Sequence, residues 1–128
     1  MNDPISDLLT RIRNANRALL PAVEVPHSRI KESIVVILKR EGYISDFAVE
    51  GKVPRTIKVR LKYQGKKSII EGMQRVSTPG LRRYVGATEI PRVRGGLGVA
   101  VLSTSEGLLT DVQARRKNLG GELLCYVW

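Results

Sequence analysis

The sequence has very little cysteine and histidine. Its 128 residues contain one cysteine, Cys125, and one histidine, His27. A single cysteine excludes an internal disulfide and a cysteine-rich zinc site. Cys125 lies in an apolar stretch and is predicted to be a small buried hydrophobe. His27 follows a proline between two predicted helices and is expected to be a turn residue. Few groups therefore remain for metal binding or nucleophilic catalysis, which excludes most enzyme classes.

Long apolar runs are also missing. The longest uninterrupted runs span only a few residues, whereas about 20 are needed to cross a bilayer. The chain opens with Met1-Asn2-Asp3-Pro4, which lacks the basic and apolar start of a signal peptide. We therefore expect a soluble protein of a reducing compartment, with no membrane partner.

Positive charge is abundant and unevenly placed. The formal net charge is +10, which points to a polyanionic partner. Residues 52–94 contain twelve basic and two acidic residues, whereas the rest of the chain carries ten of each. Fourteen of the 22 basic residues are arginine, whose planar donor fork suits phosphates and bases. A solvated face is the alternative interpretation, but an excess confined to a third of the chain favours nucleic acid.

The first half of the chain predicts an α-β-α-β-β lobe. A helix capped by Asp3 is expected because apolar residues recur there at helical spacing. It should end by about Leu20, because the residue before Pro21 avoids helical angles. A short strand precedes a second helix that Ser28 can cap and Gly42 can end. Two strands follow, over residues 43–50 and 57–63. The second strand alternates apolar with basic residues, which indicates one buried face and one face of cations.

The second half predicts short, mostly antiparallel strands with one short helix. Glycine and proline recur from residue 64 onward, which is typical of turns between such strands. A buried strand over residues 99–102 precedes a polar turn over 103–107. Thr110 and Gln113 form a capping-box pattern at the start of a short helix that Gly120-Gly121 should close. A terminal strand runs to Trp128. The fold class is thus α+β, with one lobe at residues 1–66 and a second at residues 67–128. Apolar residues make up 42% of the chain, which is enough to form a hydrophobic core.

The sequence contains no complete motif for binding a nucleotide cofactor or for nucleophilic catalysis. Gly96-Leu97-Gly98 resembles half of a dinucleotide-binding fingerprint, but it precedes a strand instead of opening a helix, and the third glycine is missing. The sequence has no Walker loop, and the turn at Ser103 to Ser105 has no base beside it. We therefore predict no enzymatic activity, no cofactor, no metal and no small-molecule substrate.

The polar turn can instead bind RNA. Ser103, Thr104 and Ser105 place three hydroxyl groups in a short loop that ends at Gly107. Hydroxyl and backbone groups suit the 2′-hydroxyls and shallow minor groove of RNA. An ordinary serine turn is the alternative, and composition alone does not decide between them.

A second candidate is the segment Arg82-Arg83-Tyr84, which follows Thr78-Pro79-Gly80. Two guanidinium groups adjoin an aromatic ring that can stack on an unpaired base, a contact worth about 1–3 kcal/mol. Tyr84 as a core residue or as a packing residue of an edge strand is the alternative, and spacing does not decide between stacking and packing.

Three motifs, in order along the chain, carry a family resemblance. They are Asp3-Pro4-Ile5 with residues 8–15, Gln74-Arg75-Val76-Ser77 with residues 79–82, and residues 99–111 with Ala114-Arg115 and residues 120–124. Together they strongly resemble the bacterial-type small-subunit (30S) ribosomal protein eight family, over essentially the whole chain.

This resemblance implies a two-lobe α/β protein that binds a central-domain stem of 16S ribosomal RNA directly and helps to assemble the small subunit. The hydroxyl turn would contact an internal loop of that stem, supported by Tyr84 and Arg82, while Arg11 and Asn14 touch the RNA backbone. Glu106 departs from the family, because its place is often basic in relatives. The candidate RNA-binding residues are Ser103, Thr104, Ser105, Gly107, Tyr84, Arg82, Arg83, Arg11, Asn14, Asp3, Pro4, Thr78, Lys58 and Lys62.

The expected partners are small-subunit ribosomal RNA and neighbouring small-subunit proteins. Arg92, Arg94 and the cluster at residues 115–117 can face those proteins or the RNA. The expected location is the cytoplasmic ribosome, with an organellar ribosome left open. Repression of the chain's own messenger RNA through a similar stem is an alternative function, and an RNA-processing enzyme is a weaker one.

Overall fold

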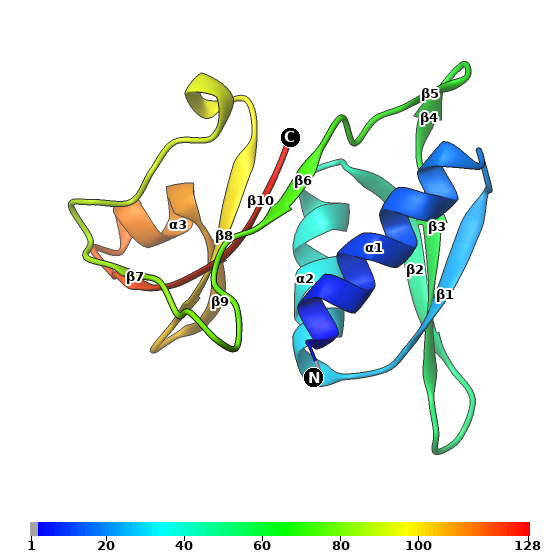
Figure 1. Ribbon diagram of the computed structural model, residues 1–128, viewed down its shortest axis with the longest axis horizontal. Helices are drawn as coiled ribbons and strands as arrows, with labels where there is room; N and C mark the ends of the chain where they lie inside the picture. The colour runs from blue at the N-terminus through cyan, green and yellow to red at the C-terminus, as the bar shows by residue number, and fades with distance from the viewer. Residues whose placement is uncertain (1–2) are drawn as a thin grey trace. The chain divides into compact units, whose positions relative to one another are not determined.

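The computed structural model describes residues 3–128, which form two compact units (Figure 1). The first unit ends at Glu71 and the second spans Gly72–Trp128, whereas the sequence placed the division after residue 66. Both units combine helices with antiparallel strands. This confirms the predicted α+β class.

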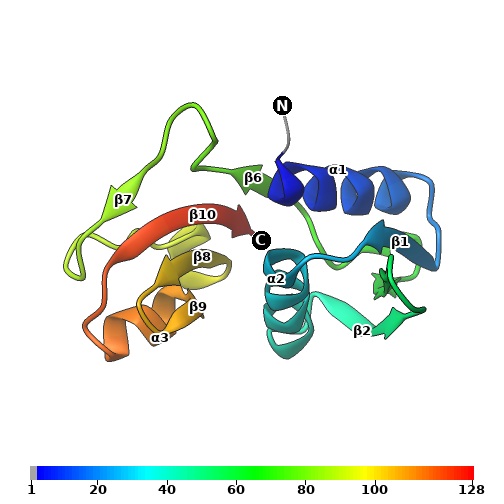
Figure 2. The same cartoon turned by 90° about the horizontal axis from the view of Figure 1, so that it is seen from below.

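The first unit is a three-stranded sheet with two helices and a small separate ribbon. Its elements are α1 (Pro4–Arg17), β1 (Ala22–Pro26), α2 (Arg29–Arg40), β2 (Ile44–Glu50), β3 (Thr56–Leu61), β4 (Tyr63–Gln64) and β5 (Lys67–Ser68). The antiparallel sheet has the order β1-β3-β2, and β4 pairs with β5. Helix α1 packs on β1, α2 packs on β2, and the helices contact each other (Figures 1 and 2). The predicted α-β-α-β-β order is confirmed.

Helix α1 begins and ends within the bounds that the sequence predicts. The Asp3 carboxylate accepts hydrogen bonds of 3.2 Å from two backbone N–H groups of the first turn, and Pro4 occupies that turn. The helix ends at Arg17, in agreement with the predicted end by about Leu20, and Leu19 adopts a left-handed φ of 56°. Leu19 is 49% exposed, so it does not extend the buried apolar stripe.

Helix α2 is capped by Ser28, as predicted, and is joined to α1 by an ion pair. The buried Lys31 ammonium donates to the Asp7 carboxylate at 3.1 Å and to the Pro26 carbonyl at 3.0 Å. Burial alone would raise the pKa of Asp7, but hydrogen bonds from Arg11 and Lys31 outweigh it and lower the pKa below its ordinary value. The remaining buried residues of α2 are apolar and form its core face: Ile34, Val35, Ile37 and Leu38.

The second unit is an antiparallel sheet with one short helix. Its elements are β6 (Met73–Arg75), β7 (Tyr84–Val85), the 3₁₀ turn η1 (Arg94–Gly96), β8 (Val99–Thr104), β9 (Gly107–Thr110), α3 (Asp111–Arg116) and β10 (Gly121–Val127). The strand order is β6-β10-β8-β9, and β7 also pairs with β10. A compact apolar core lies between the sheet, α3 and the long loop before β8; it contains Ile90, Val93, Ala100, Leu102, Ala114 and Leu123.

Helix α3 has the predicted capping box but a different end. Thr110 and Gln113 exchange side-chain and backbone hydrogen bonds of 3.0 and 3.3 Å. The predicted stop at Gly120-Gly121 is wrong, because Asn118 already takes the left-handed φ of 55° that ends the helix. The two glycines instead allow close approach of neighbouring strands. A Cβ on Gly121 would collide with the Ser103 carbonyl, and one on Gly120 with the carbonyl of β7.

Cys125 is fully buried in β10, as predicted. Burial raises the pKa of its thiol to about 12. The native thiol should therefore react negligibly with a maleimide at pH 8, and it should react fully in urea. Because the folded pKa lies above the unfolded value, this group should also reduce stability progressively as the pH rises from about 9 to 12. Stoichiometric labelling of the native protein would contradict this prediction.

Candidate RNA-binding surface

The hydroxyl turn is the tip of the β8–β9 hairpin. Thr104 and Gly107 pair, Ser105 and Glu106 form the turn, and Gly107 has the positive φ (93°) that closes it. The Thr104 hydroxyl accepts from the Glu106 N–H at 3.1 Å and donates to the Gly107 carbonyl at 2.8 Å. The exposed Ser105 hydroxyl has no partner within residues 3–128. Thr104 therefore shapes the turn, and Ser105 is available to a ligand.

Strand β10 brings the two candidate segments together. Glu122 in β10 lies opposite Tyr84 in β7 on one side and opposite Ser103 in β8 on the other. Residues directly opposite one another in a sheet project from the same face, and neighbouring strands are about 4.8 Å apart. The sheet thus presents Tyr84, Glu122 and Ser103 as one row, with Tyr84 and Ser103 about 10 Å apart.

Glu122 organises this row. Its carboxylate accepts a hydrogen bond of 2.6 Å from the Ser77 hydroxyl and is 3.1 Å from the Arg82 guanidinium. The buried Ser77 hydroxyl also accepts from the Arg83 N–H at 3.1 Å. These contacts of Arg82 with Glu122 and of Arg83 with Ser77 hold the segment against the sheet. Sequence reasoning missed both Ser77 and Glu122, although both lie inside the motifs that carried the resemblance.

Tyr84 is 69% exposed, so it is not a core residue. The alternative of Tyr84 as a core residue is thereby excluded. Tyr84 lies in β7, which pairs with β10 alone among the described strands, and its ring is open to a stacking partner. Arg83 is also exposed, and its guanidinium has no partner within residues 3–128. Thr78 is placed differently: its backbone pairs with Leu81 to close the tight turn that leads into this segment.

Glu106 is the residue that departs from the family pattern, and an ion pair balances its charge. Its carboxylate lies 2.9 Å from the Lys117 ammonium, which follows α3. Both side chains are about half exposed. The turn therefore presents hydroxyl groups and a balanced ion pair, and this pair adds no net charge to the surface.

The candidates in α1 fall into two groups. Arg11 and Asn14 are exposed on the helix surface, and the Arg11 Nε donates to Asp7 at 3.0 and 3.1 Å. Asp3 and Pro4 build the helix start, and the Asp3 carboxylate already accepts hydrogen bonds there. The exposure of Arg11 and Asn14 allows a contact with RNA. Asp3 and Pro4, in contrast, stabilise the start of the helix.

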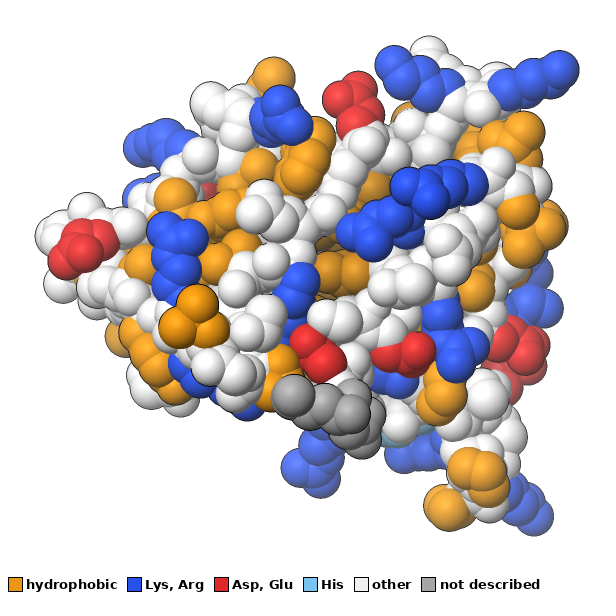
Figure 3. All heavy atoms as spheres, viewed as in Figure 1, with side chains coloured by type: hydrophobic (Ala, Val, Ile, Leu, Met, Phe, Trp, Pro, Cys, Tyr) orange, Lys and Arg blue, Asp and Glu red, His pale blue; other side chains and the backbone are white. Residues whose placement is uncertain are grey.

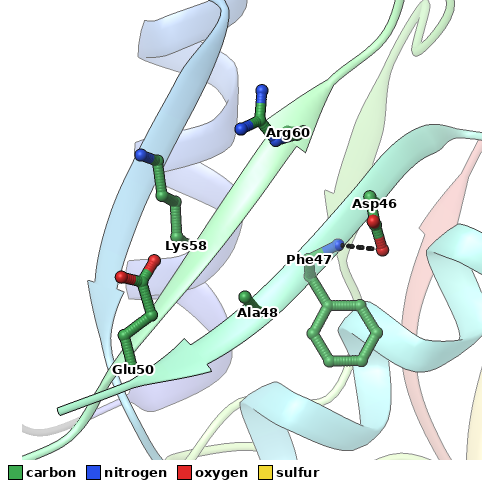
Figure 4. A pocket seen from close by; sticks show the side chains of 6 residues that line it. All are labelled: Asp46, Phe47, Ala48, Glu50, Lys58 and Arg60. Carbon is green, nitrogen blue, oxygen red and sulfur yellow. Dashed lines mark hydrogen bonds between the residues drawn. The ribbon is translucent and has the colours of Figure 1, made fainter.

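The cations of β3 are flanked by acids. β3 is the central strand, so Lys58 lies between Glu24 and Ala48, and Arg60 lies opposite Asp46. A cavity of about 110 Å³ on this outer face mixes both signs of charge (Figure 4); it is lined by Asp46, Phe47, Ala48, Glu50, Lys58 and Arg60. The face of cations predicted from the strand alone is therefore a mixed face. Lys62, just beyond β3, is exposed and its ammonium is 3.4 Å from the Gly42 carbonyl.

Basic side chains are widely distributed. Figure 3 shows Lys and Arg side chains scattered over the visible face of both units, with a few acidic side chains between them. Within residues 3–128 there is no cluster of three His, Cys, Asp or Glu side chains that could hold a metal, and no helix is long and apolar enough to span a membrane.

Comparison with known proteins decides the family. The family model for ribosomal protein S8 matches residues 3–128. The chain belongs to the ribosomal protein S8 family. It is 55% identical to small ribosomal subunit protein uS8 of Mesoplasma florum over 126 residues, which cover 98% of each chain. It is 56% identical to the protein of the same name from Nitratidesulfovibrio vulgaris over 128 residues, covering 100% of this chain and 99% of the relative.

Membership in the S8 family confirms the resemblance seen in the sequence motifs. S8 proteins are structural components of the small ribosomal subunit and not enzymes.

Proposed function

We propose that this S8-family chain binds a central-domain stem of 16S ribosomal RNA through the surface formed by the row of Tyr84, Glu122 and Ser103 and by the β8–β9 turn. The observation that carries the proposal is this row, in which β10 unites two segments that each suggested RNA binding. Binding at this surface would help to assemble the small subunit.

Hydroxyl groups and an aromatic ring suit a folded RNA. Ser103 and Ser105 offer neutral donors and acceptors for 2′-hydroxyls and base edges. The exposed Tyr84 ring can stack on an unpaired base for about 1–3 kcal/mol. The net charge of +10 supplies a sequence-independent attraction by releasing counterions from phosphates. The hydroxyl groups and the Tyr84 ring thus recognise the folded RNA, whereas the positive charge attracts RNA of any sequence.

The relatives support the proposed partners and location. They are named as small ribosomal subunit proteins and come from bacteria, so ribosomal RNA, neighbouring subunit proteins and the cytoplasmic ribosome fit this chain. Because the surface recognises RNA shape, a messenger RNA with a stem of the same shape would compete for it. Autogenous repression would use this competition.

Ser105→Ala tests the recognition directly. Removing one hydrogen bond of about 1 kcal/mol should raise the dissociation constant for the central-domain stem about fivefold. Binding to a random duplex should not change, because the remaining attraction is not sequence-specific. Filter binding or fluorescence anisotropy at fixed salt measures both. Thr88→Ala, which removes another exposed hydroxyl of the same unit, is the control. An equal loss on stem and duplex would remove this assignment.

A further inference from the structure

A second cavity lies on the first unit, beside the start of α2. It has a volume of about 380 Å³ and is lined by His27, Arg29, Glu32, Ser33, Val36 and Arg55. Arg29, Ser33 and Val36 are spaced along one face of α2, and Arg55 comes from the loop before β3. The His27 N–H donates to the Arg55 carbonyl at 3.0 Å. This backbone contact holds the loop at the cavity.

The cavity carries an excess of positive charge. Arg29 and Arg55 are exposed, and neither guanidinium forms an ion pair within residues 3–128. Glu32 is the one acidic side chain of the lining, and the His27 Nε2 lies 2.7 Å from its carboxylate. With two guanidiniums against one carboxylate, the lining has a net charge of at least +1 at neutral pH.

The cavity on the outer face of the sheet provides an internal comparison. That cavity pairs two cations with two carboxylates and measures about 110 Å³ (Figure 4). Its charges balance, so it offers an anion no net attraction. The larger cavity differs in both charge and size, and these are the two properties that an anion site requires.

We propose that this larger cavity binds a phosphodiester group of RNA, a contact that rests on the proposed function and extends it to the first unit. Guanidinium groups donate to phosphate oxygens in bidentate geometry. The Ser33 hydroxyl can donate a further hydrogen bond, and the partly exposed Val36 gives the sugar an apolar surface. A volume of about 380 Å³ exceeds what one carboxylate of a protein partner needs, which favours a nucleotide unit over an acidic side chain.

The test compares two double variants that remove the same charge. Arg29→Gln with Arg55→Gln removes both guanidiniums from the proposed site, whereas Lys39→Gln with Arg60→Gln removes two cations of the same unit that lie against Asp46. Dissociation constants are measured for full-length small-subunit RNA at several salt concentrations, after urea unfolding shows that both variants fold. The Arg29/Arg55 variant should bind about tenfold more weakly, and the slope of log K against log salt should fall by about one. The Lys39/Arg60 variant should lose less affinity and show a smaller change in the salt slope.

Three outcomes would overturn the proposal. They are equal losses in the two variants, an unchanged salt slope, and intact RNA affinity with loss of a neighbouring subunit protein instead. Failure of the proposed function gives a different result. In that case the wild-type chain would not prefer the central-domain stem to a random duplex, yet the Arg29/Arg55 variant would still bind RNA more weakly than its control.

Discussion

Gly121→Ala is expected to lower the free energy of unfolding by about 3 kcal/mol, at the upper end of the usual cost of overpacking. The added Cβ would collide with the backbone carbonyl of Ser103. A carbonyl of the central ladder cannot rotate away as a long side chain can, so β8 and β10 must separate. Because Ser103 and Tyr84 are placed by β10, RNA affinity should fall more than tenfold as well.

Gly80→Ala is the matched control for this substitution. Gly80 lies in a turn of the same unit, has no positive φ, and has no atom within 4 Å of an added Cβ. It should unfold at nearly the wild-type urea concentration and keep wild-type RNA affinity. If Gly121→Ala were as stable as Gly80→Ala, the close approach of β8 and β10 would not be a constraint on this surface.

Asp111→Ala is expected to lower the free energy of unfolding by about 3 kcal/mol. The Asp111 carboxylate is 1% exposed, accepts from the Ala100 N–H at 3.1 Å and is 2.6 Å from the Arg115 guanidinium. Its removal leaves a buried N–H without an acceptor and a largely buried cation without a counterion. Arg115 also donates to the Ile90 and Pro91 carbonyls at 3.4 Å, so the loop before β8 should loosen too.

Asp46→Ala provides the control for Asp111→Ala. Asp46 also forms an ion pair, with Lys39 at 2.9 Å, but both side chains are at least half exposed. Exposed pairs contribute about 1 kcal/mol or less. Urea unfolding of the two variants should therefore differ by about 2 kcal/mol. Equal urea midpoints for the two variants would show that the buried pair of Asp111 and Arg115 does not stabilise the second unit.

Local chemistry explains what the sequence could predict. Asp3, Ser28 and the pair of Thr110 with Gln113 cap their helices through neighbours within three residues, so a short motif contains all of the information. Strand β3 could be predicted for the same reason, because apolar and basic residues alternate at consecutive positions of the chain. The family followed from motifs in the same way.

Contacts between distant residues explain what the sequence could not predict. Ser77 meets Glu122 across 45 positions, and Arg82 meets it across 40. The acids beside β3 come from two other strands, so the strand alone suggested a wholly basic face. The sequence named Tyr84 and Ser103 separately, and only the pairing of β10 with both of its neighbours shows that they share one surface.

The most direct test of the central claim places a cleavage reagent on the turn. Because the Cys125 thiol is buried, a cysteine introduced as Glu106→Cys can be labelled alone with an iron chelate that generates hydroxyl radicals. Bound to naked small-subunit RNA, this protein should cut within one compact stem of the central domain. The same reagent on Ala48→Cys, at the exposed outer face of the first sheet, should leave that stem largely intact. Dispersed or absent cleavage from position 106 would contradict RNA recognition by the turn.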